Sequence, residues 1–219
     1  SVGVVAQSSE RAGALMHIAE GVLSLPVLAG CAALSAGCVA MGVRRLDETR
    51  MPLAALLGAA FMVASTLHMP VGVGSVHLIL NGLAGLLLGW AVFPLFFVAL
   101  LLQAALFSFG GFTVLGANLL IMAAPALLCH LLLAPALRGE PSRRRLLLVG
   151  AGCGVLGVGG ATVLAALLLN LSGGSLFDHL VGMLVLSHAP VFVVDALISA
   201  LALNLLWRML PDMTRELCP

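Results

Sequence analysis

Long apolar segments alternate with short polar ones along most of the chain. Charged loops or turns rich in glycine and proline separate them. A run of about 20 apolar residues can cross a bilayer as a helix. The pattern therefore predicts about seven transmembrane segments, at roughly residues 21–43, 51–67, 78–90, 92–107, 113–137, 146–171 and 180–210.

The third and fourth of these segments are short for complete spans. They are expected to form either one broken span or a re-entrant pair. Backbone polar groups cannot remain unpaired in hydrocarbon, so helices are the expected structure throughout. The predicted fold class is an all-α, polytopic membrane bundle, and residues 68–77, which contain proline and glycine, are expected to form a loop.

Composition strengthens this prediction and excludes whole classes of protein. Hydrophobic residues make up 62% of the 219 residues and charged residues only 9%. A soluble domain carries about 25% charged residues, which are needed to cover its surface. A soluble enzyme and a nucleic-acid-binding protein are therefore excluded, and the lipid bilayer is the main partner of the chain.

All ten cationic side chains are arginine, and their positions predict the orientation of the chain. Three lie in residues 44–50, four in residues 138–145, and two near the C-terminal end. With seven segments these three regions fall on one side, which the positive-inside rule assigns to the cytoplasm. The N-terminus is then outside and the C-terminus cytoplasmic.

Most of the histidines share the opposite, outer side in this topology. Only His130 lies toward the inner side, whereas the others lie at or near the outer ends of segments: His17, His68, His77, His179 and His188. Single outer histidines could simply be polar tips at the membrane interface. As a set they favour shared metal ligation, because neutral imidazole is the commonest protein metal ligand. A site rich in nitrogen suits cobalt, nickel, copper or zinc.

Met16 and His17 suggest a more specific arrangement. If Met16 is the true start, its free amine, the His17 backbone nitrogen and the His17 Nδ1 can chelate one metal ion in adjoining five- and six-membered rings. A further nitrogen, such as that of His77, would complete four ligands. A deprotonated amide favours planar coordination and therefore late first-row metals.

Three stretches resemble signatures of one family, and they span the chain from Met16 to about Arg208: Met16-His17-Ile18-Ala19-Glu20-Gly21, then His68-Met69-Pro70-Val71-Gly72-Val73-Gly74-Ser75-Val76-His77-Leu78, and Ser187-His188-Ala189-Pro190. Together they resemble the CbiM/NikM family, the substrate-binding (S) components of cobalt and nickel energy-coupling factor transporters. The loop from His68 to His77 looks closer to the cobalt branch. In the third stretch, Asp195 stands where the family more often has Glu.

The resemblance implies a fold, a cargo and partners. It implies an S-component fold that binds Co²⁺, or alternatively Ni²⁺, through Met16, His17 and His77, with His68 and His188 as less certain ligands. It also implies an ATP-driven transporter in the inner membrane of a bacterium or archaeon. The implied partners are a transmembrane coupling component, ATPase subunits and a small accessory membrane subunit. The chain contains no P-loop sequence of its own.

Residues 1–15 precede the family's characteristic start. They are expected to be an N-terminal extension, and residues 16–219 the membrane-embedded transport component. A wrongly assigned start or a cloning remnant is favoured over a natural fused segment.

Two other patterns point to other functions. Ser75, His77 and Asp178 share the predicted outer side and could serve an intramembrane serine hydrolase, although the flanks of Ser75 do not match G-x-S-x-G. The stretch from Gly152 to Gly157 matches a dinucleotide-binding pattern but lies inside an apolar span. Close helix packing is therefore the better interpretation of these glycines.

Overall fold

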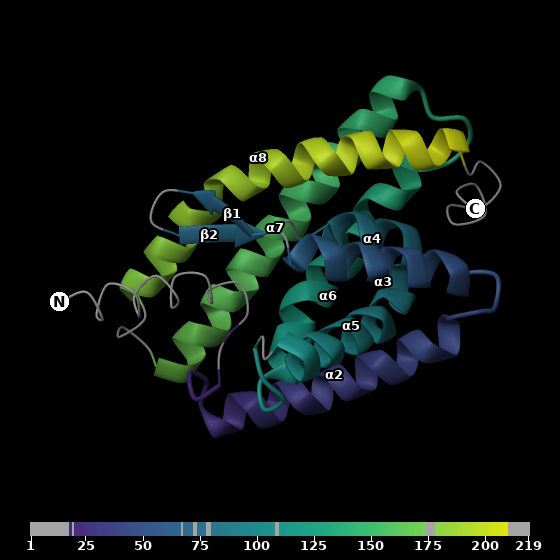
Figure 1. Cartoon of the computed structure of the whole chain (residues 1–219). Helices are drawn as coiled ribbons and strands as arrows, with labels where there is room; N and C mark the ends of the chain where they lie inside the picture. Colours follow the sequence, from purple (N-terminus) through teal and green to yellow (C-terminus); the bar gives the residue numbers. More distant parts are fainter. Residues whose placement is uncertain are drawn as a thin grey trace.

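The structure, a computed structural model, is a bundle of helices with one short β-hairpin (Figure 1). It describes residues 18, 20–66, 68–71, 74–77, 80–107, 110–173 and 178–209, and of residues 66–71, 74–77 and 178–189 it describes the backbone. The helices are α2 (Leu25–Arg45), α3 (Met51–Thr66), α4 (Asn81–Leu88), α5 (Val92–Phe107), α6 (Leu115–Leu133), α7 (Arg143–Gly173) and α8 (Asp178–Met209). Short 3-10 helices follow α4 and α6, at Gly89–Ala91 and Ala134–Leu137.

Every predicted apolar segment contains a helix, and the helical membrane fold is confirmed. The count of seven spans is not. Within the described residues, five helical stretches are long and apolar enough to cross a membrane, and Met51–Ser65 is apolar but shorter. The five are Leu25–Arg45, Asn81–Phe107, Leu115–Leu137, Arg143–Gly173 and Pro190–Met209.

The loop expected at residues 68–77 contains a hairpin. Strand β1 (His68–Val71) pairs with β2 (Gly74–His77) in antiparallel register, so that His68 lies opposite His77. Each strand has only four residues, and proline and glycine occur within them. Because proline and glycine are typical of loops, the sequence does not predict this hairpin.

Helices α4 and α5 form a re-entrant pair within the span-length stretch 81–107. Three contacts join α4 and the turn after it to α6: Asn81 with Met122, Gly85 with Ala126, and Gly89 with His130. The residue numbers increase in the same order on both sides. Helix α4 therefore runs beside α6 in the same direction. Helix α5 then runs back along α3, as the contacts Phe61–Phe96 and Ser65–Gln103 show. Gly89, with φ +56°, lies at the reversal.

Glycines bring α7 and α8 into close contact. A side chain at Gly154 would overlap the backbone of Ala196, and one at Gly150 would overlap that of Ala200. These glycines belong to the small-residue spacing of α7, and Gly157 similarly makes room for Asn81 on α4. The packing interpretation of residues 150–157 is confirmed.

All eight described arginines lie at one end of the bundle, which we call the arginine end. It comprises the α2–α3 connection, the α6–α7 connection and the C-terminal end of α8, on the right of Figure 1. The arginines are Arg44, Arg45, Arg50, Arg138, Arg143, Arg144, Arg145 and Arg208. The Arg45 guanidinium lies 5.5 Å from the ring centroid of Trp90, which places the start of α5 at the same end.

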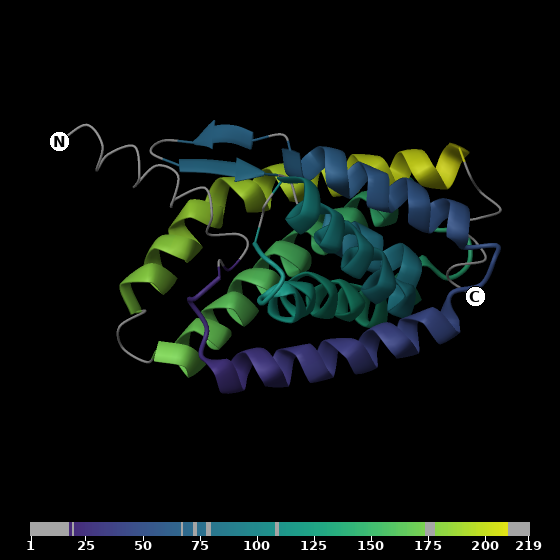
Figure 2. The same ribbon diagram turned by 60° about the horizontal axis from the view of Figure 1, so that its bottom comes forward.

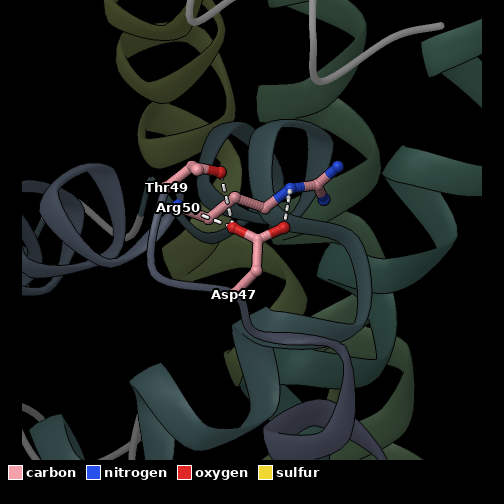
Figure 3. A network of polar contacts seen from close by, with 3 residues as sticks. All are labelled: Asp47, Thr49 and Arg50. Carbon is pink, nitrogen blue, oxygen red and sulfur yellow. Dashed lines mark hydrogen bonds and ion pairs between the residues drawn. The ribbon is translucent and has the colours of Figure 1, made fainter.

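A small polar network closes the α2–α3 connection (Figure 3). The Asp47 carboxylate accepts hydrogen bonds from the Thr49 hydroxyl (2.6 Å) and the Arg50 N–H (3.0 Å), and lies 3.8 Å from the Arg50 side chain. The hydrogen bond from Thr49, followed by that from Arg50, lowers the pKa of Asp47 below its usual value. The network is exposed to solvent, so it shapes the turn and adds little to stability.

The opposite end, which we call the hairpin end, carries the hairpin, residues 20–24, the turn before α6, the last turn of α7 and the first turn of α8. Figure 2 shows the same separation of the two ends after rotation. The hairpin end is therefore where the predicted outer-side residues that the structure describes are found.

Candidate metal site

The predicted ligands are only partly within the described structure. Met16 and His17 lie outside the described residues. His68 and His77 face each other across the hairpin, whose strand β2 contacts α8. In an antiparallel pair, residues directly opposite have Cα atoms about 4.5–5.5 Å apart. The backbone therefore brings His68 and His77 together at the hairpin end, while His188 lies in the first part of α8.

The chain directly after His17 is held by α6. The Asn118 side chain makes two hydrogen bonds with Ile18: its Oδ1 accepts the Ile18 N–H (2.9 Å), and its Nδ2 donates to the Ile18 carbonyl (3.1 Å). Both residues are buried. Sequence reasoning missed Asn118, whose only signal is a polar amide within the apolar run of the fifth predicted segment.

Glu20 makes a second attachment to the same region. Its Oε1 accepts the Thr113 N–H at 3.2 Å. Gly111 has φ +121°, and any side chain there would overlap the Glu20 carboxylate. A carboxylate beside the beginning of a helix is favourable, because the helix dipole is positive there. Ile18 is thus attached to α6, and Glu20 to the turn that leads into α6.

The segment after His77 is held by α8. The Asp195 carboxylate is completely buried, and its Oδ2 accepts the Leu80 N–H at 3.0 Å. Its Oδ1 accepts the Ser199 hydroxyl at 3.1 Å. Leu80 has φ 51°, a left-handed conformation that non-glycine residues rarely adopt. Asp195 thus holds the turn between the hairpin and α4.

Asn81 joins three helices. Its Nδ2 donates to the carbonyls of Met122 on α6 and Gly157 on α7, and its own Oδ1 accepts the Gly82 N–H. A bond to His77 and an interhelical contact are both compatible with its sequence position. The structure shows the interhelical contact.

The remaining candidates are placed as follows. His130 lies near the arginine end, with its Nδ1 2.8 Å from the Leu86 carbonyl, as its predicted inner position requires. Among the described residues, no three His, Cys, Asp or Glu side chains form a group that could hold a metal ion. Asp178, suggested for a hydrolase, begins α8, and Ser75 lies opposite Pro70 in the hairpin. Their side chains lie outside the described structure.

The helical arrangement defines a class of membrane transport protein. The crystal structure of a truncated transition metal transporter matches with a TM-score of 0.72 and 25% identity, covering 88% of this chain and 98% of that one. A second transition metal transporter structure has the same fold, with a TM-score of 0.73 and 23% identity over 91% of this chain and 96% of that one. The CbiM family profile, described as the cobalt uptake substrate-specific transmembrane region, matches residues 17–213. The chain belongs to this family, so the resemblance of its motifs is confirmed.

Curated relatives agree with this assignment. A Haemophilus influenzae protein named for metal transport is 54% identical over 197 residues, covering 90% of this chain and 96% of that protein. The cobalt transport protein CbiM of Geobacter sulfurreducens is 31% identical, covering 92% of this chain and 62% of that protein. The fused nickel transport protein NikMN of Rhodobacter capsulatus is 37% identical over 69% of this chain, which spans 46% of its length. The family consists of components of cobalt and nickel uptake, not enzymes, so the hydrolase alternative is set aside.

Proposed function

We propose that this chain captures a divalent metal ion as the substrate-binding component of an energy-coupling factor transporter. The observation that carries the proposal is the attachment of Ile18 to Asn118 at the end of the bundle that also holds the His68–His77 pair. It brings both motif regions to the hairpin end. Cobalt is the proposed ion, because the family profile is that of cobalt uptake. Nickel is the alternative, because a fused nickel transport protein is among the relatives.

The proposed ligands are the Met16 amine, the His17 backbone nitrogen and imidazole, and the His77 imidazole. Four nitrogens, one of them a deprotonated amide, favour a planar site, which suits Co²⁺ and Ni²⁺. His68 lies opposite His77 and His188 lies in α8, so either could complete a site that lacked the amine. On this proposal residues 16–219 form the transport component, and residues 1–15 are not part of it.

The proposed orientation places the arginine end in the cytoplasm and the hairpin end outside. The eight arginines at one end support it, because positive residues remain on the cytoplasmic side. The ion would then be captured at the outer face of the inner membrane. The proposed partners are a transmembrane coupling component, ATPase subunits and a small accessory subunit. The fused organisation named for NikMN supports a partnership with further transport subunits.

A metal titration tests the ligand set. Two full proteins, one beginning at Ser1 and one at Met16, would be purified, their N-termini sequenced, and titrated with Co²⁺ and Ni²⁺. The protein beginning at Met16 should bind tightly and lose binding in His77→Ala, whereas His130→Ala should keep it. Inserting Ala between Met16 and His17 should remove the dependence of binding on His77, because the added amide nitrogen can supply the fourth nitrogen donor in its place.

The protein beginning at Ser1 separates two versions of the site. A peptide bond to Met16 removes the free amine, so this protein should bind weakly unless its extension is cleaved. Equally tight binding by both intact proteins would eliminate the amine ligand and leave a site of imidazoles. Equal behaviour of the His77→Ala and His130→Ala proteins would contradict a site at the hairpin end.

A further inference from the structure

Asn118 has an unusual place for a polar side chain. It lies in the first turn of α6, is 3% exposed, and is surrounded by an apolar helix sequence. Polar groups at membrane depth are costly and usually have a function. A primary amide carries a donor and an acceptor side by side, so it can pair with both the N–H and the C=O of one residue. Asn118 does this with Ile18, at 2.9 and 3.1 Å.

We propose that Asn118 is a positioning residue for the metal chelate, a role that rests on the proposed function of Met16 and His17. The Ile18 N–H belongs to the peptide bond that joins His17 to Ile18, and a peptide bond is planar. By accepting this N–H, Asn118 acts on the peptide unit that carries a proposed ligand residue. It touches no metal itself, and acts by fixing the direction from which the chelating residues reach the site.

The contact between Glu20 and Thr113 supports the same role. Glu20 follows Ile18 by two residues and is attached to the turn that leads into α6. Two attachments within three residues prevent the segment from rotating about a single contact. Glu20 is exposed, whereas Ile18 is buried, so Asn118 supplies the attachment that is shielded from water.

Loss of the amide would leave the Ile18 N–H and C=O without their side-chain partner in a buried place. Such groups are stabilised only if the chain shifts toward water or another polar partner. Either shift would misdirect the chelate, whose five- and six-membered rings tolerate little displacement. Removal of a group that orients metal ligands lowers metal affinity by about 10- to 100-fold.

The test compares two changes, each of which removes hydrogen bonding at the start of α6. Asn118→Leu removes both hydrogen bonds to Ile18 and keeps the branched shape of the side chain. Ser35→Ala is the matched control, because the buried Ser35 hydroxyl donates to the Gly116 carbonyl at 2.7 Å, two residues before Asn118, and does not contact Ile18. Both full proteins would be titrated with Co²⁺ and Ni²⁺ beside the unchanged protein and His17→Ala.

Asn118→Leu should weaken binding about 10- to 100-fold and shift the visible absorption bands of the bound ion, which report ligand geometry. Ser35→Ala should bind with the original affinity and spectrum, even if its thermal midpoint falls. If Asn118→Leu fails to accumulate in the membrane, Glu20→Ala replaces it, because Glu20 is exposed and its loss should weaken binding in the same direction.

The outcomes separate this inference from the proposed function. Binding by Asn118→Leu, or by Glu20→Ala in its place, within twofold of the unchanged protein, together with loss in His17→Ala, would overturn the positioning role alone. Unchanged binding in His17→Ala would overturn the proposed ligand set and the positioning role with it.

Discussion

Asp195 shows how a single buried carboxylate can organise a turn. It accepts the N–H of Leu80, which lies three residues after His77 and has a left-handed backbone. Leaving a buried donor unpaired costs about 1–3 kcal/mol. Asp195 is therefore expected to hold the C-terminal side of the hairpin in place.

Asp195→Ala should increase hydrogen–deuterium exchange in residues 74–84, because the Leu80 N–H loses its acceptor. Ser199→Ala is the control, since the Ser199 hydroxyl bonds the other oxygen of the same carboxylate without contacting Leu80. Peptide-level mass spectrometry in detergent would measure the exchange. Equal exchange in the two variants would show that the turn is held by other contacts.

The sequence motifs predicted candidate ligand residues, but the sequence did not predict which residues contact each other in the fold. The motif around His77 identifies a candidate ligand directly. Asn118 and Asp195 act on residues 100 and 115 positions away in the chain, and such tertiary partners leave no local periodicity. Asn81 illustrates the same limit, because its spacing from His77 does not reveal the hydrogen bonds that it makes to the carbonyls of Met122 and Gly157.

At the scale of the elements, the close contact of α7 with α8 depends on glycine. Gly154→Ala should destabilise the bundle by about 1–3 kcal/mol, because the added methyl group overlaps the Ala196 backbone and overpacking displaces whole helices. Gly37→Ala on α2 is the control: no atom lies within 4 Å of the new methyl group, and alanine favours a helix. Thermal unfolding in one detergent should show a lower midpoint for Gly154→Ala alone.

The elements themselves were partly predictable. Hydrophobic patterning located every helix among the described residues, because bilayer-length apolar runs are strong signals. It left the path of residues 78–107 open, since these residues are apolar almost throughout and hydrophobicity does not mark where a chain reverses. The reversal at Gly89 depends on backbone conformation and on contacts with α6. The hairpin was missed because four-residue strands containing Pro70 and Gly74 have the composition of a loop.

At the scale of the whole molecule, the re-entrant pair explains how the arginines come to share one end. If residues 81–107 crossed the bilayer once, the α2–α3 and α6–α7 connections would lie on opposite sides. Because α4 and α5 reverse direction, both connections and the end of α8 lie together (Figures 1 and 2). The position of the charges and the path of the helices, which are independent features of the chain, therefore agree on one arrangement.

This arrangement can be tested by cysteine labelling. In a protein whose five native cysteines are replaced, one new cysteine would be introduced at a time. Gly173→Cys, at the hairpin end, should react with a membrane-impermeant maleimide added to intact cells. Pro141→Cys, at the arginine end, should react only after the cells are opened, because the positive-inside rule places this loop in the cytoplasm. Metal uptake by each protein would confirm that the new cysteine leaves the fold intact.

The reverse labelling pattern would have a specific consequence. With the re-entrant path kept, it would place His77 and the attachment of Ile18 at the cytoplasmic face, where an ion entering from outside could not be captured. A single crossing by residues 81–107 with a cytoplasmic α2–α3 connection would give the same labelling and would contradict the reversal at Gly89. Labelling of both positions from outside would instead contradict a membrane-spanning α7, because this span-length helix separates Pro141 from Gly173. Labelling from outside at Gly173 alone supports capture at the outer face. Because the arginines of the α2–α3 connection place that connection in the cytoplasm, the same result also supports the re-entrant path.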